Sequence, residues 1–132
     1  MSMGPVNWIA VILAPALTVA LAIVWYGPVF RIGRQLLPGD SKPTGRYWLV
    51  FAVMLIGSIM LGHNFARIGS GVLDAKPWLY FMQSGGIAIA FVMPAVWLTY
   101  LRARVSPSVR MIECGFWLAA YLAMGAVFWA LA

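Results

Sequence analysis

Residues 1–30, MSMGPVNWIAVILAPALTVALAIVWYGPVF, contain no Asp, Glu, Lys or Arg. Three later stretches share this property: residues 47–66, 77–101 and 114–132. The four stretches are 30, 20, 25 and 19 residues long, and about 20 apolar residues are enough for a helix to cross the hydrocarbon of a bilayer. The sequence therefore predicts an all-α membrane protein, with four transmembrane helices in an up-down bundle, short loops and a single domain over residues 1–132.

Prolines and the nearest charges set the expected bounds of these helices. We expect the spans at about residues 6–30, 47–66, 77–101 and 109–131. Pro5 suits a first-turn position, because its missing N–H would have no partner there. Pro15 and Pro94 lie inside the first and third spans, where a proline removes a backbone hydrogen bond and exposes the carbonyl one turn back. Both spans are therefore expected to bend.

The composition excludes several classes of protein. The chain is 64% hydrophobic and 9% charged, whereas a globular protein has about 25% charged residues. Its net charge of +6 comes from Lys and Arg close to the predicted membrane edges, with no basic run long enough to follow a nucleic-acid backbone. A single cysteine, Cys114, excludes an intramolecular disulfide, and four ligands for a structural zinc are missing. We expect membrane lipids as partners, no nucleic acid and no metal.

The basic residues predict the orientation of the helices. Short cytoplasmic loops are enriched in Lys and Arg. The first and third loops hold seven of the nine, and the second loop holds two: Arg31, Arg34, Lys42, Arg46, Arg102, Arg104 and Arg110 against Arg67 and Lys76. Loops 31–46 and 102–110 are therefore expected in the cytoplasm, with both termini outside.

Four polar residues form the candidate polar site. Glu113 is the only acid in or against a span, and intramembrane acids often mark ion or proton paths. Arg110 precedes it by three residues, so the favoured interpretation is an interfacial ion pair between them. His63 closes the second span on the opposite side of the membrane, on the order of 25 Å away, and is expected to make interfacial hydrogen bonds. Gln83 lies in the outer half of the third span.

Small residues at four-residue spacing, together with the adjacent glycines Gly85 and Gly86, are candidates for close helix packing. In lipid, such spacing lets two helix backbones approach each other. The candidates are Ser58, Gly62, Gly85, Gly86, Gly115, Ala119 and Ala123. The last three form a series on the fourth span, which makes that span the best candidate for an internal or intersubunit interface. Trp117 and Tyr121 lie inside the same span and are expected to form a packing face.

The first span also carries a family resemblance. It opens with Val6-Asn7-Trp8-Ile9-Ala10-Val11 and closes with Trp25-Tyr26-Gly27-Pro28-Val29-Phe30, which resembles a bacterial integral-membrane family catalogued as domain of unknown function 1761. The family pattern has Asn where this chain has Glu113, and Tyr-His where it has Phe116-Trp117. The resemblance implies a four-helix protein of the bacterial inner membrane, with no known activity.

No catalytic motif is present. The chain has no nucleophile elbow, no HExxH and no phosphate-binding glycine loop, and its three acids, Asp40, Asp74 and Glu113, lie in separate loop regions. We therefore expect no catalytic residues and a protein that is not an enzyme.

Three functions remain open. The first is an accessory subunit that packs laterally against itself or a larger membrane complex, such as a respiratory, transport or photosynthetic assembly. The second is a small transporter or channel subunit that uses Glu113. The third is a protein that binds a lipid, quinone or pigment in a groove beside Gly85, Gly86 and Pro94, with Trp117 as a wall.

Overall fold

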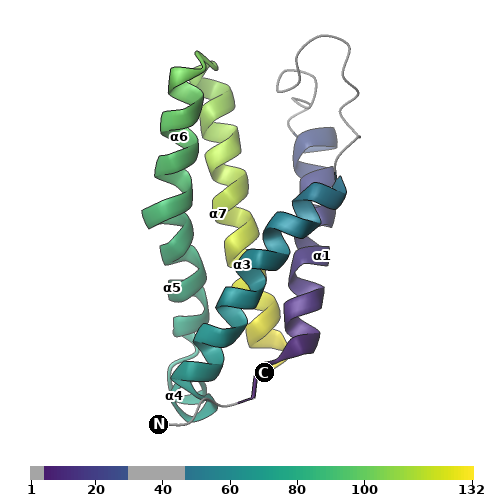
Figure 1. The fold of residues 1–132 in the computed structure, drawn as a ribbon, viewed down its shortest axis with the longest axis vertical. Coiled ribbons are helices and arrows are strands. Elements are labelled where there is room, and N and C mark those ends of the chain that lie inside the picture. Colours follow the sequence, from purple (N-terminus) through teal and green to yellow (C-terminus); the bar gives the residue numbers. More distant parts are fainter. Residues whose placement is uncertain (1–4, 30–46) are drawn as a thin grey trace.

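The computed structural model describes residues 5–29 and 47–132, and every regular element in this part of the chain is a helix (Figure 1). Four of the helical spans in the described residues are long and apolar enough to cross a membrane, which confirms the predicted all-α fold. The spans are α1 (Trp8–Val24) with the π-helical turn η1 (Trp25–Val29); α3 (Tyr47–Ile68); α5 (Trp78–Ile87) with the π-helical turn η2 (Ala88–Val92) and α6 (Met93–Arg102); and α7 (Pro107–Ala130).

The connection between α3 and α5 contains a short helix that the sequence analysis did not anticipate. This helix, α4, spans Ser70–Ala75 and follows Gly69, whose φ of 92° is readily adopted only by glycine. The third connection turns at Arg104, with φ 59°. The first loop, which carries Arg31 and Lys42 among the residues used to predict orientation, lies outside the described residues.

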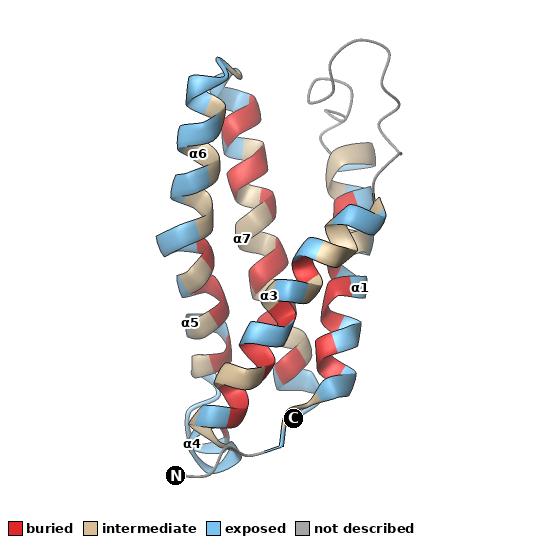
Figure 2. Ribbon diagram, viewed as in Figure 1, coloured by how far each residue is buried: buried red, intermediate tan, exposed pale blue. Residues whose placement is uncertain are grey.

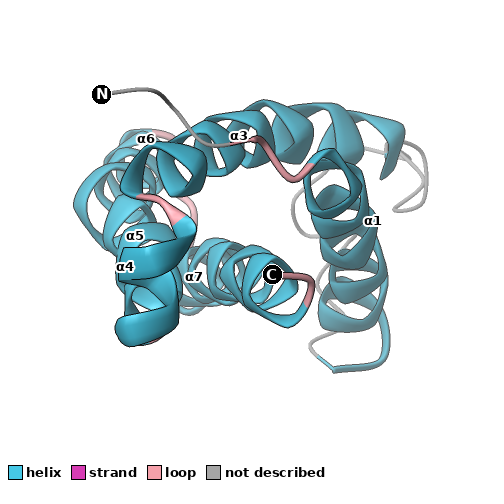
Figure 3. Ribbon diagram, turned by 90° about the horizontal axis from the view of Figure 1, so that it is seen from below, coloured by secondary structure: helices cyan, strands magenta, loops and turns pink. Residues whose placement is uncertain are grey.

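Helix α7 is at the centre of the packing. It contacts α1 on one side and α5, η2 and α6 on the other, while α3 packs mainly against α1 (Figures 1 and 3). Helix α3 reaches the third span near its own end, where the rings of Phe65 and Tyr80 lie 4.8 Å apart. Buried residues follow α7 over most of its length (Figure 2). The first and third spans therefore pack on different sides of α7.

Pro15 shows how this bundle compensates for a proline inside a span. Pro15 has no N–H for the carbonyl of Val11, four residues earlier. The hydroxyl of Ser58, on α3, donates a hydrogen bond of 2.8 Å to that carbonyl. Thr18 donates to the carbonyl of Pro15 at 2.7 Å. The sequence predicted an exposed carbonyl at this point, and the neighbouring helix supplies its partner.

Helix α1 begins later than the sequence analysis expected. Asn7 is its N-cap residue, because the side-chain oxygen accepts a hydrogen bond from the backbone N–H of Ala10 at 3.2 Å. Pro5 lies outside the helix, so its assignment to the first turn was wrong. The Asn7 amide also donates to the carbonyl of Leu131 at 3.0 Å. One side chain therefore begins the first span and joins it to the end of the last.

Candidate functional site

The carboxyl group of Glu113 is buried where η1, α6 and α7 meet. Glu113 is only 5% exposed, and the hydroxyl of Tyr100 donates a hydrogen bond to its Oε2 at 3.3 Å. The hydroxyl of Tyr26 also interacts with this carboxyl group. The other oxygen, Oε1, is buried and has no hydrogen-bond partner among the described residues. A buried acceptor of this kind is costly to leave unpaired.

Arg110 does not form the expected ion pair with Glu113; among the described residues its guanidinium has no carboxylate partner. The guanidinium lies instead over the indole ring of Trp97, 4.6 Å from the ring centroid. Arg110 is 8% exposed, and its buried Nε has no hydrogen-bond partner in the described part of the chain. Arg110 and Glu113 therefore contact different aromatic side chains of α6: the guanidinium stacks on Trp97, and the carboxyl group accepts a hydrogen bond from Tyr100.

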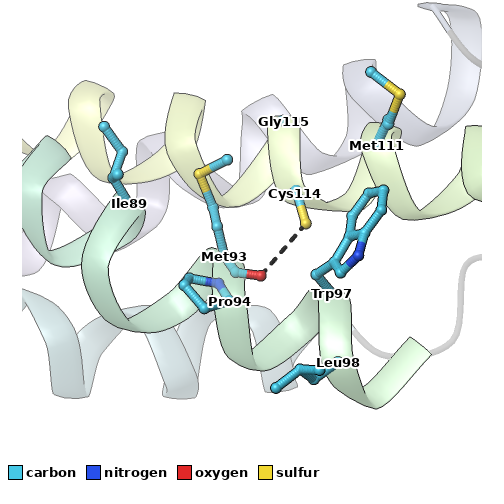
Figure 4. Close-up of a pocket in the computed structure, with 8 residues that line it drawn as sticks. All are labelled: Ile89, Met93, Pro94, Trp97, Leu98, Met111, Cys114 and Gly115. Atoms are coloured by element: carbon cyan, nitrogen blue, oxygen red, sulfur yellow. Dashed lines mark hydrogen bonds between the residues drawn. The ribbon is translucent and has the colours of Figure 1, made fainter. Parts of the chain in front are cut away.

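A groove of about 580 Å³ lies between the third span and α7 (Figure 4). Its walls are almost entirely apolar: Ile89, Met93, Pro94, Trp97, Leu98, Met111, Cys114 and Gly115. The Cys114 thiol donates to the carbonyl of Met93 at 3.6 Å, across the floor of the groove (Figure 4). Trp97 belongs both to this wall and to the stack with Arg110. The side chain of Trp97 therefore lines the apolar groove and also contacts the guanidinium of Arg110, which has no carboxylate partner among the described residues.

The groove runs along the bundle and opens outward. From Trp97 to Ile89 it covers eight residues of the third span, which corresponds to about 12 Å along a helix axis. Ile89, Leu98 and Met111 are 59%, 50% and 67% exposed. The open side of the groove therefore faces the surface that the four apolar spans turn towards lipid.

The sequence predicts this groove only in part. Pro94 does line it, as predicted. The expected wall residue Trp117 and the expected neighbours Gly85 and Gly86 do not line this groove. Gly85 instead packs against Leu122 of α7, and the ring of Trp117 lies 6.4 Å from that of Tyr121.

His63 and Gln83 lie away from the Glu113 carboxyl. The Nδ1 atom of His63 is 2.8 Å from the carbonyl oxygen of Ile59, and its ring meets the edge of Trp8 at 5.8 Å. Trp8 begins α1 and Tyr26 follows its end, so His63 and Glu113 lie at opposite ends of the bundle (Figure 1). Gln83 is half-buried and makes no side-chain hydrogen bond within the described residues. Of the four predicted polar residues, only Glu113 and Arg110 therefore lie close together, near the start of α7; His63 and Gln83 lie elsewhere.

A comparison with protein families matches residues 9–129 to the family described as Protein of unknown function (DUF1761). The chain belongs to this family. The match covers all four spans of this DUF1761 protein and includes Glu113 and Arg110, which confirms the resemblance seen in its sequence. No curated protein and no solved structure matches the chain.

The small residues of this DUF1761 protein differ in what they contact. A Cβ atom at Gly62 would lie 2.7 Å from Val11, one at Gly85 would lie 2.9 Å from Leu122, and one at Gly115 would lie 3.2 Å from Trp25. Ser58 is fully buried, whereas Ala119 and Ala123 are half-buried. Gly86 lies on the outer face with nothing within 4 Å, so it does not contribute to packing within the described chain.

Two further glycines, which the spacing of small residues does not indicate, lie at close helix contacts. A Cβ atom at Gly125 would lie 2.8 Å from the backbone oxygen of Tyr80, and one at Gly57 would lie 2.6 Å from the hydroxyl of Tyr121. Neither glycine has a small residue four positions away. The four-residue pattern therefore passes over both, and only the crossing of the helices identifies them.

Proposed function

We propose that this DUF1761 protein is a non-catalytic membrane protein that holds an amphipathic membrane molecule in the groove between its third and fourth spans. The observation that carries this proposal is the shared wall: Trp97 lines an apolar groove and also holds the unpaired cation of Arg110. A volume of about 580 Å³ falls within the range of small-molecule sites. An apolar tail would occupy the groove, and a polar head would reach the arginine.

The chemistry of the wall supports binding rather than catalysis. Its only nucleophilic side chain is Cys114, whose thiol already donates to the carbonyl of Met93. The carboxyl group of Glu113 is held on another side of α7 by Tyr100. The groove thus presents shape and apolar surface to a ligand, without an acid or base aimed into it.

The test is to identify what copurifies with the chain. We would extract the full-length protein in mild detergent and measure bound small molecules by mass spectrometry. Met111→Trp should fill the groove and remove the bound molecule. Ile56→Trp is the matched control, because Ile56 is similarly exposed, at 72% against 67%, but lies on α3 outside the groove. Equal amounts of ligand in the wild type and both variants would contradict the proposal.

A second candidate function is lateral association with another copy of this chain or with a larger membrane complex. Gly86 and Ala90 both lie on the exposed face of the third span, and nothing lies within 4 Å of a Cβ atom at Gly86. Small residues at this spacing permit close approach of another helix. Gly86→Leu should then reduce copurification of the partner, whereas Gly71→Leu, at another open glycine, should not. Unchanged partner stoichiometry in Gly86→Leu would argue against this interface.

The transport alternative depends on Glu113, whose Oε1 is buried without a partner among the described residues. An ionisable group inside a bundle is a common part of a transport path. A pH-dependent solute flux across the membrane of proteoliposomes that is present in the wild type and lost in Glu113→Gln would support this function. Flux that is unchanged in that variant would exclude Glu113 as the transport group.

For the location, we infer the inner membrane of a bacterium, with loops 31–46 and 102–110 in the cytoplasm. The distribution of Lys and Arg supports this orientation, since seven of the nine lie in those two loops.

A further inference from the structure

We infer that the occupant of the groove is an anionic phospholipid, with its phosphate on Arg110 and one acyl chain along the groove. This inference rests on the proposed function of the groove and adds the chemical class of its ligand. Three observations carry it: the unpaired charge of Arg110, the charges around it, and the direction of the groove.

Arg110 needs an anionic partner that the described residues do not supply. A guanidinium has five N–H donors and no acceptor, and in the described part of the chain the only interaction of this one is with the ring of Trp97. Its Nε atom is buried, and a buried donor of a charged group is costly to leave without an acceptor. Phosphate oxygens match the forked geometry of a guanidinium and would supply both the charge and the acceptors. The ring of Trp97 already holds the cation at the groove wall.

The surroundings of Arg110 favour an anion over a neutral head. The other charged side chains on this third connection are Arg102 and Arg104, and both are exposed. Glu113 is the only acid on α7, and its Oε2 is engaged by Tyr100. The carbonyl groups of a quinone could accept hydrogen bonds here but would leave the charge of Arg110 uncompensated. Basic groups at a membrane edge attract anionic headgroups.

The direction of the groove fits a lipid that is anchored at its head. Arg110 lies in the first turn of α7, next to the connection of residues 103–106. From Trp97, beside Arg110, the groove extends about 12 Å along the third span to Ile89. A phosphate at Arg110 would therefore lie near the membrane edge, and the chain attached to it would run towards the bilayer centre.

The experiment is a lipid competition on the full-length chain. We would reconstitute it in nanodiscs that contain phosphatidylcholine with a minor share of phosphatidylglycerol, transfer it to mild detergent and count retained lipids by native mass spectrometry. We expect about tenfold enrichment of phosphatidylglycerol on the wild type. Arg110→Gln should abolish this enrichment, and Arg110→Lys should restore part of it. Arg67→Gln is the matched control and should keep the enrichment, because it removes an exposed arginine from the end of α3, away from Arg110.

The possible outcomes distinguish a wrong assignment of the ligand from a wrong assignment of the groove. Equal retention of both lipids by the wild type would overturn the anionic-phospholipid inference, whether or not Arg110→Gln folds. If Met111→Trp still loses a bound neutral molecule, the proposed function of the groove stands. If Met111→Trp retains the same lipids as the wild type, the groove itself is not the site and both proposals fail.

Discussion

The hydroxyl of Ser58 on α3 donates a hydrogen bond of 2.8 Å to the carbonyl oxygen of Val11 on α1. This is the carbonyl that Pro15, four residues later, leaves without its helical N–H partner. Ser58 is fully buried and Val11 is 1% exposed. Because lipid offers no hydrogen-bond donor to such a carbonyl, the proline of one helix and the serine of the next form one structural unit.

Ser58→Ala should destabilise the bundle because the carbonyl of Val11 loses its donor. We expect a loss of about 0.5–1.7 kcal/mol in the free energy of unfolding, the range measured for hydrogen bonds between membrane helices. In a Pro15→Ala background, the restored N–H can bond to that carbonyl, so the same substitution should cost less. Unfolding by SDS in detergent micelles measures both. An equal cost in the two backgrounds would refute the link between Ser58 and Pro15.

Asn7 should contribute to stability through two separate hydrogen bonds. Asn7→Ala removes the N-cap of α1, at a cost of about 1 kcal/mol, together with the bond to the carbonyl of Leu131. Asn7→Asp keeps the capping oxygen and loses only the amide donor. In Asn7→Ala, we expect faster exchange of the backbone amides at the start of α1 and at the end of α7. In Asn7→Asp, we expect faster exchange at the end of α7 alone. Identical exchange profiles for the two variants would be inconsistent with this division.

Gly125 and Gly86 should respond in opposite directions to alanine. A Cβ atom at Gly125 would lie 2.8 Å from the backbone oxygen of Tyr80, so Gly125→Ala should destabilise by about 1–3 kcal/mol through overpacking. Nothing lies within 4 Å of a Cβ atom at Gly86. Gly86→Ala should therefore be neutral or stabilising by up to about 1 kcal/mol, since alanine is the better helix former. SDS unfolding compares the two, and a destabilised Gly86→Ala variant would contradict the placement of that glycine.

Tyr100→Phe should change the environment of the Glu113 carboxyl group, because it removes the O–H that donates to Oε2 at 3.3 Å. Infrared difference spectroscopy can follow the carboxyl band, and Glu113→Gln identifies that band by removing it. Tyr47→Phe, at the start of α3, is the control and should leave the band unchanged. A band that is the same in Tyr100→Phe and the wild type would show that this hydrogen bond is absent in the membrane.

The second and third connections should lie on opposite sides of the membrane. Lys76 precedes the third span and Arg104 follows it. In a Cys114→Ala background, single Lys76→Cys and Arg104→Cys variants would be treated with a maleimide that cannot cross the membrane. We expect labelling of intact cells in Lys76→Cys alone, and labelling of Arg104→Cys only after the membrane is opened. Labelling of both in intact cells would contradict the up-down arrangement.

The polar site could be predicted from the sequence only at the level of single residues. Glu113 is conspicuous as the sole acid against a span, and its spacing from Arg110 suggests an ion pair. The structure instead gives each residue a partner on α6, Tyr100 for the carboxyl group and Trp97 for the guanidinium. A spacing of three residues on one helix predicts a contact between those two residues only. It does not predict which aromatic side chains of a neighbouring helix lie close enough to contact them.

The sequence was enough to predict four apolar helices, because whether a charge-free stretch is long enough to cross the hydrocarbon depends only on its own residues. It also determined that Pro15 would leave a carbonyl exposed. The packing of the helices was needed to learn that Ser58 bonds to that carbonyl, that Gly125 contacts Tyr80, and that Trp97 lies between a groove and a guanidinium. This is because lipid solvates any outward apolar face equally well. Which faces turn inward therefore depends on how closely particular side chains of different helices fit one another.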